Sequence, residues 1–341
     1  MRTIFTRFFA IAPPVGIEPT TYGLEVRRSI QLSYGSNLLA QIYRPLNYRL
    51  AVRSRLLVLF AAICFATTGT SRALGPDSAT SLGVAAIRFI IGAIALFAIT
   101  ALARKSLVTT VSLPLYIWII AGFGQAMYGA TFFAAVHETG VAVGTVVALG
   151  SAPILTGILS AVLFRSLPSR KWMLATAIAI AGMSLIVLSG NDTNVSAIGV
   201  LYALGAGLGY ALFALASKRI VESGVASDVA MARVFGIAAV MLGPTLFFVN
   251  IDWVLTTAGI SLGLWLGIVT VALAYWAYAS GLARLEPRET TMITLAEPVV
   301  ATVLGALVLD ERPAALAWMG IVVVIVALAY ESLNNSSNVK H

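Results

Sequence analysis

The chain has 341 residues, of which 59% are hydrophobic and 11% charged, and its net charge at pH 7 is +8. Soluble globular proteins carry about 25% charged residues, so this composition excludes a water-soluble fold and favours lipid as the solvent. The basic residues lie in short loops between apolar runs and form no basic face with interleaved aromatic residues. A nucleic-acid-binding function is therefore excluded.

Residues 1–52 do not fit a membrane segment. The apolar run at 8–11 is too short for a signal peptide, and the remainder shows no helical periodicity. The string GIEPTTYGLEVRRSIQLSYG at 16–35 resembles a peptide that recurs where a reading frame is called through a tRNA gene. We expect residues 1–52 to be either a disordered basic arm in the cytoplasm or a mis-annotated N-terminal extension.

Apolar runs of 17 to 25 residues recur through the rest of the chain. A helix needs about 20 such residues to cross a hydrocarbon core of roughly 30 Å. The alternating segments of about ten residues that are typical of a membrane barrel are absent from the sequence. The sequence therefore predicts an all-α membrane protein with ten transmembrane helices, at 56–74, 79–103, 113–136, 140–164, 172–188, 197–216, 229–249, 258–282, 290–309 and 314–330.

The charged residues are distributed unequally between alternate loops. One set of loops carries Arg53, Arg55, Arg104, Lys105, Arg165, Arg170, Lys171, Lys218, Arg219, Arg284 and Arg288. The other set carries Asp77, His137, Glu138, Asp192 and Asp252, with Arg72 and Arg312 as its only basic residues. Because basic loops stay in the cytoplasm, we expect a multi-pass protein of the cell membrane, inner or plasma, with both termini in the cytoplasm.

A single offset of 145 positions relates the two halves of the membrane region. It pairs Arg88 with Arg233, Gly122 with Gly267, Pro153 with Pro298, and Pro168 with Pro313. Five helices per half is an odd number, so the second half enters the membrane from the opposite face. We predict two inverted five-helix repeats, at 53–190 and 196–333, followed by a short cytoplasmic tail at 334–341. Inverted repeats are common in secondary transporters, although a duplication can also persist for stability alone.

The second half contains EPVVA at 297–301 and LDERP at 309–313. These motifs, with the ten segments and the five-helix repeat, resemble the EamA family of the drug/metabolite transporter superfamily over about residues 55–333. The first half departs from the family pattern. It has AP without the glutamate at 152–153, and FRS at 164–166 in place of the acidic-Arg turn.

The resemblance implies a secondary active transporter that exports small metabolites, such as amino acids or related compounds, by alternating access. A multidrug or toxic-compound efflux carrier, a channel and a non-transporting membrane scaffold remain alternatives. The resemblance also implies a central cavity, for which the candidate lining residues are Phe65, Gln125, Tyr128, Tyr210, Tyr275, Tyr278 and Ser280. Tyr275 and Tyr278 are three positions apart and can share one helix face. Ordinary helix packing is the alternative role for each of these residues.

Two arginines and two prolines are coupling or gating candidates. Arg88 and Arg233 should lie at equivalent depths, a turn or two inside opposite faces, where an arginine can snorkel or line a vestibule. Pro153 and Pro298 occupy equivalent positions in the fourth and ninth segments. A proline inside a helix removes one backbone donor and weakens the helix locally.

Glu297 is the one carboxylate well inside a predicted membrane segment. A charged carboxylate in low dielectric is costly, so Glu297 should take up a proton or find a partner on a facing helix. Pro298 beside it should leave the carbonyl of Thr294 without its usual donor. We expect protonation of Glu297, or its bond to substrate, to be coupled to opening of the cavity, with protons as the coupling ion. A purely structural hydrogen bond is the alternative.

Residues that would support an enzyme are scarce. The histidines are His137 in a loop and His341 at the terminus, Cys64 is the one cysteine, and no G-x-x-x-x-G-K phosphate loop is present. We therefore predict no enzymatic activity, no metal and no cofactor. The expected partners are a small-molecule substrate and the lipid bilayer, and the expected state is a monomer or a homodimer.

Overall fold

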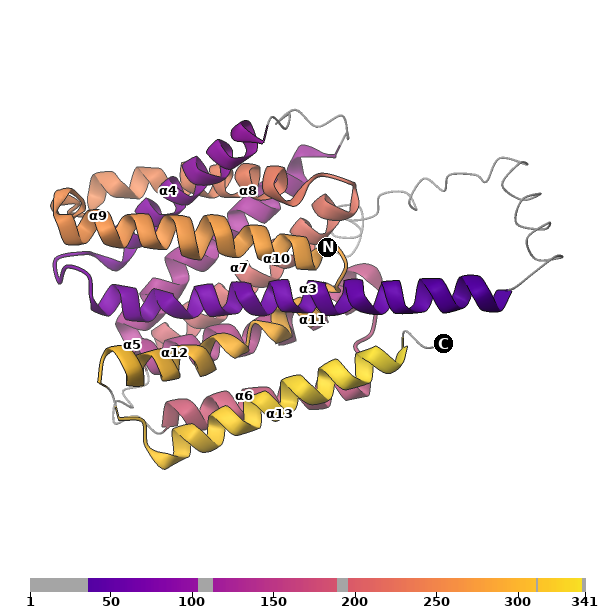
Figure 1. The fold of residues 1–341 in the computed structure, drawn as a ribbon. Helices are drawn as coiled ribbons and strands as arrows, with labels where there is room; N and C mark the ends of the chain where they lie inside the picture. The colour runs from indigo at the N-terminus through magenta and orange to yellow at the C-terminus, as the bar shows by residue number, and fades with distance from the viewer. Residues whose placement is uncertain (1–35, 104–112, 189–195, 311, 339–341) are drawn as a thin grey trace.

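The structure is a computed structural model that describes residues 36–103, 113–188, 196–310 and 312–338 (Figure 1). All regular elements in these ranges are helices. The first half contains α3 (Ser36–Ala73), α4 (Ser81–Leu102), α5 (Leu115–Phe164) and α6 (Arg170–Leu188). The second half contains α7 (Ala197–Glu222), α8 (Ser227–Leu242), η1 (Gly243–Phe248), η2 (Asp252–Leu255), α9 (Thr257–Leu264), η3 (Trp265–Leu273), α10 (Ala274–Leu282), α11 (Pro287–Ile293), α12 (Ala296–Val308) and α13 (Ala315–Asn338).

Eight helical segments of the described ranges are long and apolar enough to cross a membrane. They are Leu50–Ala73, Ser81–Leu102, Leu115–Thr139, Val143–Phe164, Ala197–Glu222, Ser227–Phe248, Thr257–Leu282 and Pro287–Val308. These eight spans confirm eight of the ten predicted segments. The other two segments are helical as α6 and α13, but the apolar part of α13, Ala315–Glu331, is shorter than a typical span.

The first helix begins at Ser36, inside the segment for which the sequence predicts no structure. Extending an existing helix adds one hydrogen bond per residue without a new nucleation step, so the first span can continue backwards into this segment. Residues 1–35, and with them most of the predicted extension, lie outside the described residues. The loop charges Arg104, Lys105 and Asp192, and Glu311 of the LDERP motif, lie outside them as well.

Helix α5 contains two of the predicted spans and turns back on itself between them. A straight helix of its 50 residues would be about 75 Å long, more than twice the hydrocarbon thickness. A Cβ atom built on Gly144 would lie 3.0 Å from the backbone nitrogen of Val136, whereas eight residues of straight helix span about 12 Å. The chain therefore reverses between these two residues and gives a first arm (115–136) and a second arm (144–164).

Three of the later spans are interrupted. Helix α8 continues into the 3₁₀ turn η1, and the π-helical stretch η3 separates α9 from α10. The ninth span breaks between α11 and α12, at Thr294 and Leu295. As predicted, the Thr294 carbonyl lacks its usual donor at position 298, and the Glu297 N–H donates to it instead, at 2.9 Å. A tighter i→i+3 bond at the break replaces the bond that Pro298 cannot make.

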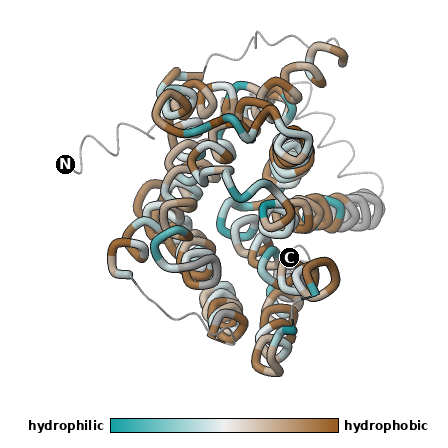
Figure 2. Tube along the Cα trace, turned by 90° about the vertical axis from the view of Figure 1, so that its left-hand side faces the viewer, coloured by the Kyte–Doolittle hydropathy of each residue, from teal (hydrophilic) through white to brown (hydrophobic). Residues whose placement is uncertain are grey.

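Two buried apolar clusters hold the helices together. The larger cluster joins α3, α4, both arms of α5, and the helices from α7 to α10. The smaller joins α6 and α13 to the second arm of α5 and to α11 and α12. Helices α6 and α13 lie side by side at one edge of the bundle (Figure 1). Seen along the helix axes, mostly hydrophobic residues run through the bundle, as expected where lipid surrounds it (Figure 2).

Glycines bring the helices into close contact. A Cβ atom on Gly124 of α5 would lie 2.6 Å from the carbonyl oxygen of Gly209 on α7, and a Cβ on Gly209 would lie 2.6 Å from that of Gly124. Small residues allow this approach where lipid supplies no hydrophobic force between helices. The two facing glycines therefore set the close approach of α5 to α7.

One close contact recurs with the two halves exchanged. A Cβ atom on Gly122 would lie 2.6 Å from Cβ of Ile237, so the first arm of α5 packs closely on α8. A Cβ atom on Gly267 would lie 3.0 Å from the nitrogen of Gly92, so η3 packs equally closely on α4. Gly267 lies 145 positions after Gly122, and Ile237 lies 145 positions after Gly92. The two contacts are thus related by the sequence offset.

Candidate functional site

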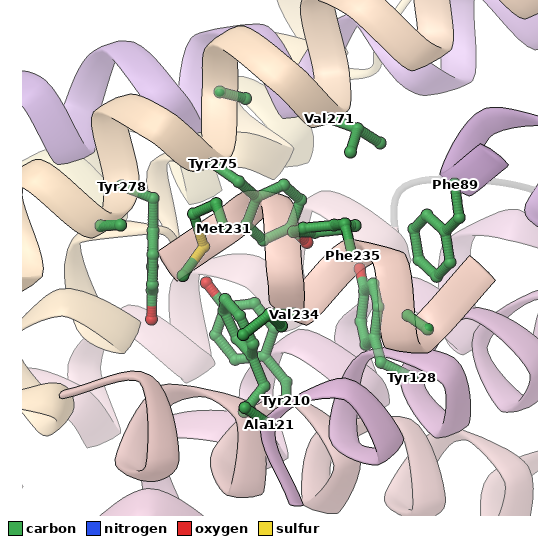
Figure 3. Close-up of a cluster of buried hydrophobic side chains, with 14 of the residues drawn as sticks. Phe89, Ala121, Tyr128, Tyr210, Met231, Val234, Phe235, Val271, Tyr275 and Tyr278 are labelled. Atoms are coloured by element: carbon green, nitrogen blue, oxygen red, sulfur yellow. The ribbon is translucent and has the colours of Figure 1, made fainter. Parts of the chain in front are cut away.

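Ten aromatic rings form one continuous set of ring contacts inside the bundle, here called the aromatic cluster. Figure 3 labels Phe89, Tyr128, Tyr210, Phe235, Tyr275 and Tyr278 among them. The rings come from α3, α4, the first arm of α5, α7, α8 and α10. They are Phe65, Phe89, Tyr128, Phe132, Phe133, Tyr210, Phe213, Phe235, Tyr275 and Tyr278. Rings at such distances stabilise one another through edge-to-face and offset contacts.

Tyr275 and Tyr278 are central to this cluster. Their ring centroids lie 6.0 Å apart, which confirms that the two residues share a face of α10. The Tyr275 ring lies 4.7 Å from the Phe65 ring and 4.5 Å from the Phe235 ring. Tyr210 lies 5.6 Å from Tyr128 across the α5–α7 contact. The structure therefore brings five of the predicted cavity residues together, although their role in a cavity stays a prediction.

Several polar atoms inside the centre are unpaired. Gln125 is fully buried, and neither its Oε1 nor its Nε2 has a hydrogen-bond partner in the described part of the chain. The hydroxyl groups of Tyr210 and Tyr278 are buried without a partner there too. An unsatisfied buried polar group costs about 1–3 kcal/mol, so native proteins rarely keep one without a reason. These groups can bind the polar atoms of a ligand that enters between them.

Arg88 lies at the edge of the aromatic cluster and is only 5% exposed. Its guanidinium carbon lies 5.1 Å from the centre of the Phe89 ring and 5.9 Å from that of the Phe133 ring. The Nε atom has no hydrogen-bond partner among the described residues. Arg88 thus presents a desolvated positive charge, held by ring faces, to the interior of the bundle.

Arg233 is placed differently, although it is the repeat counterpart of Arg88. Its guanidinium lies over the ring of Trp118, 4.9 Å from the ring centre, and Trp118 is not part of the aromatic cluster. The counterpart of Trp118 in the other half is Gly263, which has no ring. The two arginines are therefore equivalent in sequence but not in surroundings.

Glu297 lies in the first turn of α12, directly after the break in the ninth span, and is partly exposed. The charge of Arg88 acts on Glu297 and on the nearby hydroxyl groups of Tyr128 and Tyr275. Arg88 and Glu297 do not form a direct ion pair in the described part of the chain. Arg88 and the Glu297 carboxyl group thus both act on the tyrosine hydroxyls without forming an ion pair with each other.

The remaining predicted residues lie outside this arrangement. The Ser280 hydroxyl donates to the carbonyl of Trp276 on its own helix at 2.7 Å and makes no ring contact. Pro153 is buried inside the second arm of α5, and Pro298 is buried behind Glu297. Sequence reasoning missed Phe213 and Phe235, which contact Tyr275. The spacing of Tyr210 and Phe213, three positions apart, was the available signal for Phe213.

Polar side chains connect the helices at the end of the bundle that carries the basic loops. Arg55 Nε on α3 lies 2.8 Å from Glu289 Oε1 on α11. Lys218 Nζ on α7 donates to the carbonyl of Leu282 at the end of α10, at 3.0 Å. Arg288 donates to the hydroxyl of Ser166 between α5 and α6, at 3.3 Å. The contacts of Arg55 and Arg288 tie the two halves together at one end of the aromatic cluster, and that of Lys218 joins two helices of the second half.

Comparison with known proteins identifies the family. The model of the EamA-like transporter family matches residues 53–188 and again residues 197–332. The chain belongs to the EamA-like transporter family. This family is part of the drug/metabolite transporter superfamily, so the protein is a multi-pass membrane transporter of that type.

One relative and one solved structure agree with this assignment. The chain is 37% identical over 273 residues to the uncharacterized transporter YwfM of Bacillus subtilis (strain 168), covering 80% of this chain and 91% of that protein. It also matches a chain of known crystal structure with a TM-score of 0.72 at 19% identity, covering 82% of this chain and 96% of the other. At that identity the second match shows the fold alone.

Proposed function

We propose that the chain is a secondary active transporter that exports small zwitterionic metabolites, amino acids or related compounds, by alternating access. The observation that supports the proposal is the buried guanidinium of Arg88 and the carboxyl group of Glu297, which both act on tyrosine hydroxyls of the aromatic cluster. A family assignment alone names no substrate. The chemistry of these side chains indicates which class of substrate the site can bind.

The site is complementary to a small zwitterion. The buried guanidinium of Arg88 suits a carboxylate, which it can bind through two parallel N–H donors. The carboxylate of Glu297 suits an ammonium group. Between them, the Gln125 amide can both donate and accept a hydrogen bond, and the surrounding rings can cover an apolar side chain. An α-amino acid carries these three features within one small molecule.

The recurring glycine contacts support two inverted five-helix halves. In a twofold arrangement, a contact between two positions must recur between their counterparts in the other half. The contact of Gly122 with Ile237 and that of Gly267 with Gly92 obey this rule. With α6 and α13 as the fifth and tenth spans, each half has five helices. Two such halves can exchange conformations and open one central site to either side.

The charged residues indicate how the protein is oriented in the membrane and which ion is coupled to transport. The polar contacts of Arg55, Lys218 and Arg288 lie at the end with the basic loops, which we assign to the cytoplasm of a cell-membrane protein, together with both termini. Glu297 is partly exposed and lies within the electrostatic influence of Arg88, a position in which binding of a proton and binding of substrate can affect each other. We therefore propose protons as the coupling ion.

The main alternative is efflux of diverse lipophilic drugs, which the ten rings of the aromatic cluster would favour by themselves. A binding panel with purified protein separates the two functions. Phenylalanine is compared with phenethylamine, which lacks the carboxylate, and with 3-phenylpropionate, which lacks the ammonium group. We expect both analogues to bind at least about tenfold more weakly than phenylalanine, because each leaves either Arg88 or Glu297 without its partner on the ligand. Equal binding of all three, or tighter binding of the amine, would favour drug efflux.

A further inference from the structure

A groove lies on the outer face of the bundle, between the second arm of α5 and the first half of α6, away from the aromatic cluster. Its volume is about 330 Å³. Apolar and small residues line it almost throughout: Ile154, Gly157, Ile158, Ala161, Pro168, Trp172, Met173, Thr176, Ala177 and Ile180. Its floor includes the Trp172 ring, whose Nε1 donates to the carbonyl of Arg288 at 3.2 Å and fixes the ring in place.

The groove faces the lipid and runs along most of one leaflet. Ile154, Ile158 and Met173 are 45%, 52% and 46% exposed at its rims. From Trp172 to Ile180, the α6 residues that line the groove, the helix rises about 12 Å, whereas half of the hydrocarbon core is roughly 15 Å. The groove runs along α6 over this distance. Its dimensions therefore suit one acyl chain of a lipid in a single leaflet.

Positive charge gathers at the end of the groove where α5 connects to α6. Arg165 follows the last residue of α5, and Arg170 and Lys171 begin α6, all three with exposed side chains. No aspartate or glutamate occurs anywhere from residue 152 to residue 188. Basic side chains beside a lipid-facing pocket between transmembrane helices attract anionic headgroups.

We propose that this groove is a binding site for an anionic glycerophospholipid. One acyl chain lies along Ile158, Met173 and Ile180, and the phosphate lies against Arg165 and Arg170. Charge complementarity is the reason for choosing this occupant over a zwitterionic lipid or a second copy of the chain. The site is separate from the aromatic cluster, so it does not depend on the identity of the transported substrate.

Native mass spectrometry of the purified full chain tests the proposal. The protein is incubated with phosphatidylglycerol and phosphatidylcholine of identical acyl chains, and retained lipid is counted. We expect one retained phosphatidylglycerol per chain and a preference for it of about tenfold or more, because each basic side chain near the headgroup adds attraction. The double variant Arg165→Gln/Arg170→Gln should abolish the preference. The control Arg53→Gln/Arg284→Gln removes two exposed charges elsewhere and should keep it.

A second pair of variants tests the groove itself. Ala177→Phe places a ring in the groove and should reduce retention of both lipids, whereas Leu174→Phe, at an exposed position of α6 that does not line the groove, should not. Absence of a headgroup preference in the wild-type protein, or loss of the preference in both double variants, would overturn the proposal. A dimer that Ala177→Phe dissociates would overturn it too, because the occupant would then be a second copy.

Discussion

Arg55 on α3 and Glu289 on α11 form an ion pair of 2.8 Å between residues 234 positions apart, and their side chains are only 13% and 12% exposed. The repeat counterparts of these residues are Val200 and Gly144, which cannot form an ion pair. The contact therefore joins α3 to α11 at one end of the bundle, and the counterpart residues form no such pair. In an alternating-access cycle it favours the conformation that is closed at this end.

Glu289→Gln should weaken this closure and expose the helix faces behind it. Ser217 on α7 is fully buried, about 10 Å along the helix from Tyr210 toward this end. In a Cys64→Ala, Ser217→Cys protein, we expect Glu289→Gln to speed labelling by a small thiol reagent at least several-fold. Glu222→Gln, which removes the i,i+4 pair of Lys218 within one helix, is the matched control. An unchanged rate, or the same increase in the control, would show that Arg55 and Glu289 do not hold this end closed.

Arg88→Gln should weaken binding of the zwitterionic substrate at least about tenfold, because the substrate carboxylate loses a desolvated, charged partner. Arg88→Lys keeps the charge but not the planar stacking on Phe89 and Phe133, so it should restore only part of the affinity. Equilibrium binding of labelled phenylalanine measures both variants. Arg233→Gln is the control, because Arg233 lies over Trp118 instead. Equal losses for Arg88→Gln and Arg233→Gln would count against a substrate role for Arg88.

Glu297→Gln keeps the size and the hydrogen bonding of the side chain but removes its ionisation. If a proton on Glu297 is exchanged during the cycle, net transport should fall at least about tenfold and lose its dependence on pH. Proteoliposome uptake measured across a series of pH values tests this, with expression and thermal stability as folding checks. Normal transport with an unchanged pH profile would leave Glu297 with a packing role only.

Gly209→Ala should destabilise the protein, because the new Cβ atom would lie 2.6 Å from the backbone oxygen of Gly124 and two helices would have to separate. Overpacking of this kind costs roughly 1–3 kcal/mol. Gly69→Ala is the control, since no atom lies within 4 Å of its added Cβ and alanine favours the helix. A thermal unfolding series in detergent should give a lower Tm for Gly209→Ala alone. Equal Tm values for the two variants would contradict the close α5–α7 contact.

Eight of the ten predicted segments could be placed from the sequence, because membrane thickness sets the length of an apolar run and such runs can be read directly from the sequence. The irregular features could not. The reversal inside α5 occurs where the sequence has no proline, and the break at Thr294 occurs four residues before Pro298. The sequence correctly places the effect of Pro298 at the Thr294 carbonyl. It does not predict the hydrogen bond that the N–H of Glu297 donates to this carbonyl. Such local rearrangements depend on backbone geometry that residue types do not determine.

In the candidate site, too, some features could be predicted from the sequence and others could not. Tyr275 and Tyr278 were predictable as a pair because their spacing places them on one helix face. Phe235 was not, since an aromatic residue in an apolar helix faces lipid or interior with equal plausibility until its neighbours are known. Arg88 and Arg233 could not be distinguished by the repeat, because Trp118 and its counterpart Gly263 decide where each guanidinium lies.

Substrate counterflow in proteoliposomes tests the central claim most directly. Vesicles containing the purified protein are loaded with a high concentration of unlabelled phenylalanine and diluted into a trace of labelled phenylalanine. An alternating-access carrier exchanges one molecule for another, so we predict that the label first accumulates inside above its equilibrium level and then declines. Arg88→Gln vesicles should show little accumulation, and protein-free vesicles none. A simple monotonic approach to equilibrium would indicate a channel, and no protein-dependent uptake for any zwitterionic metabolite tried would contradict the proposed function.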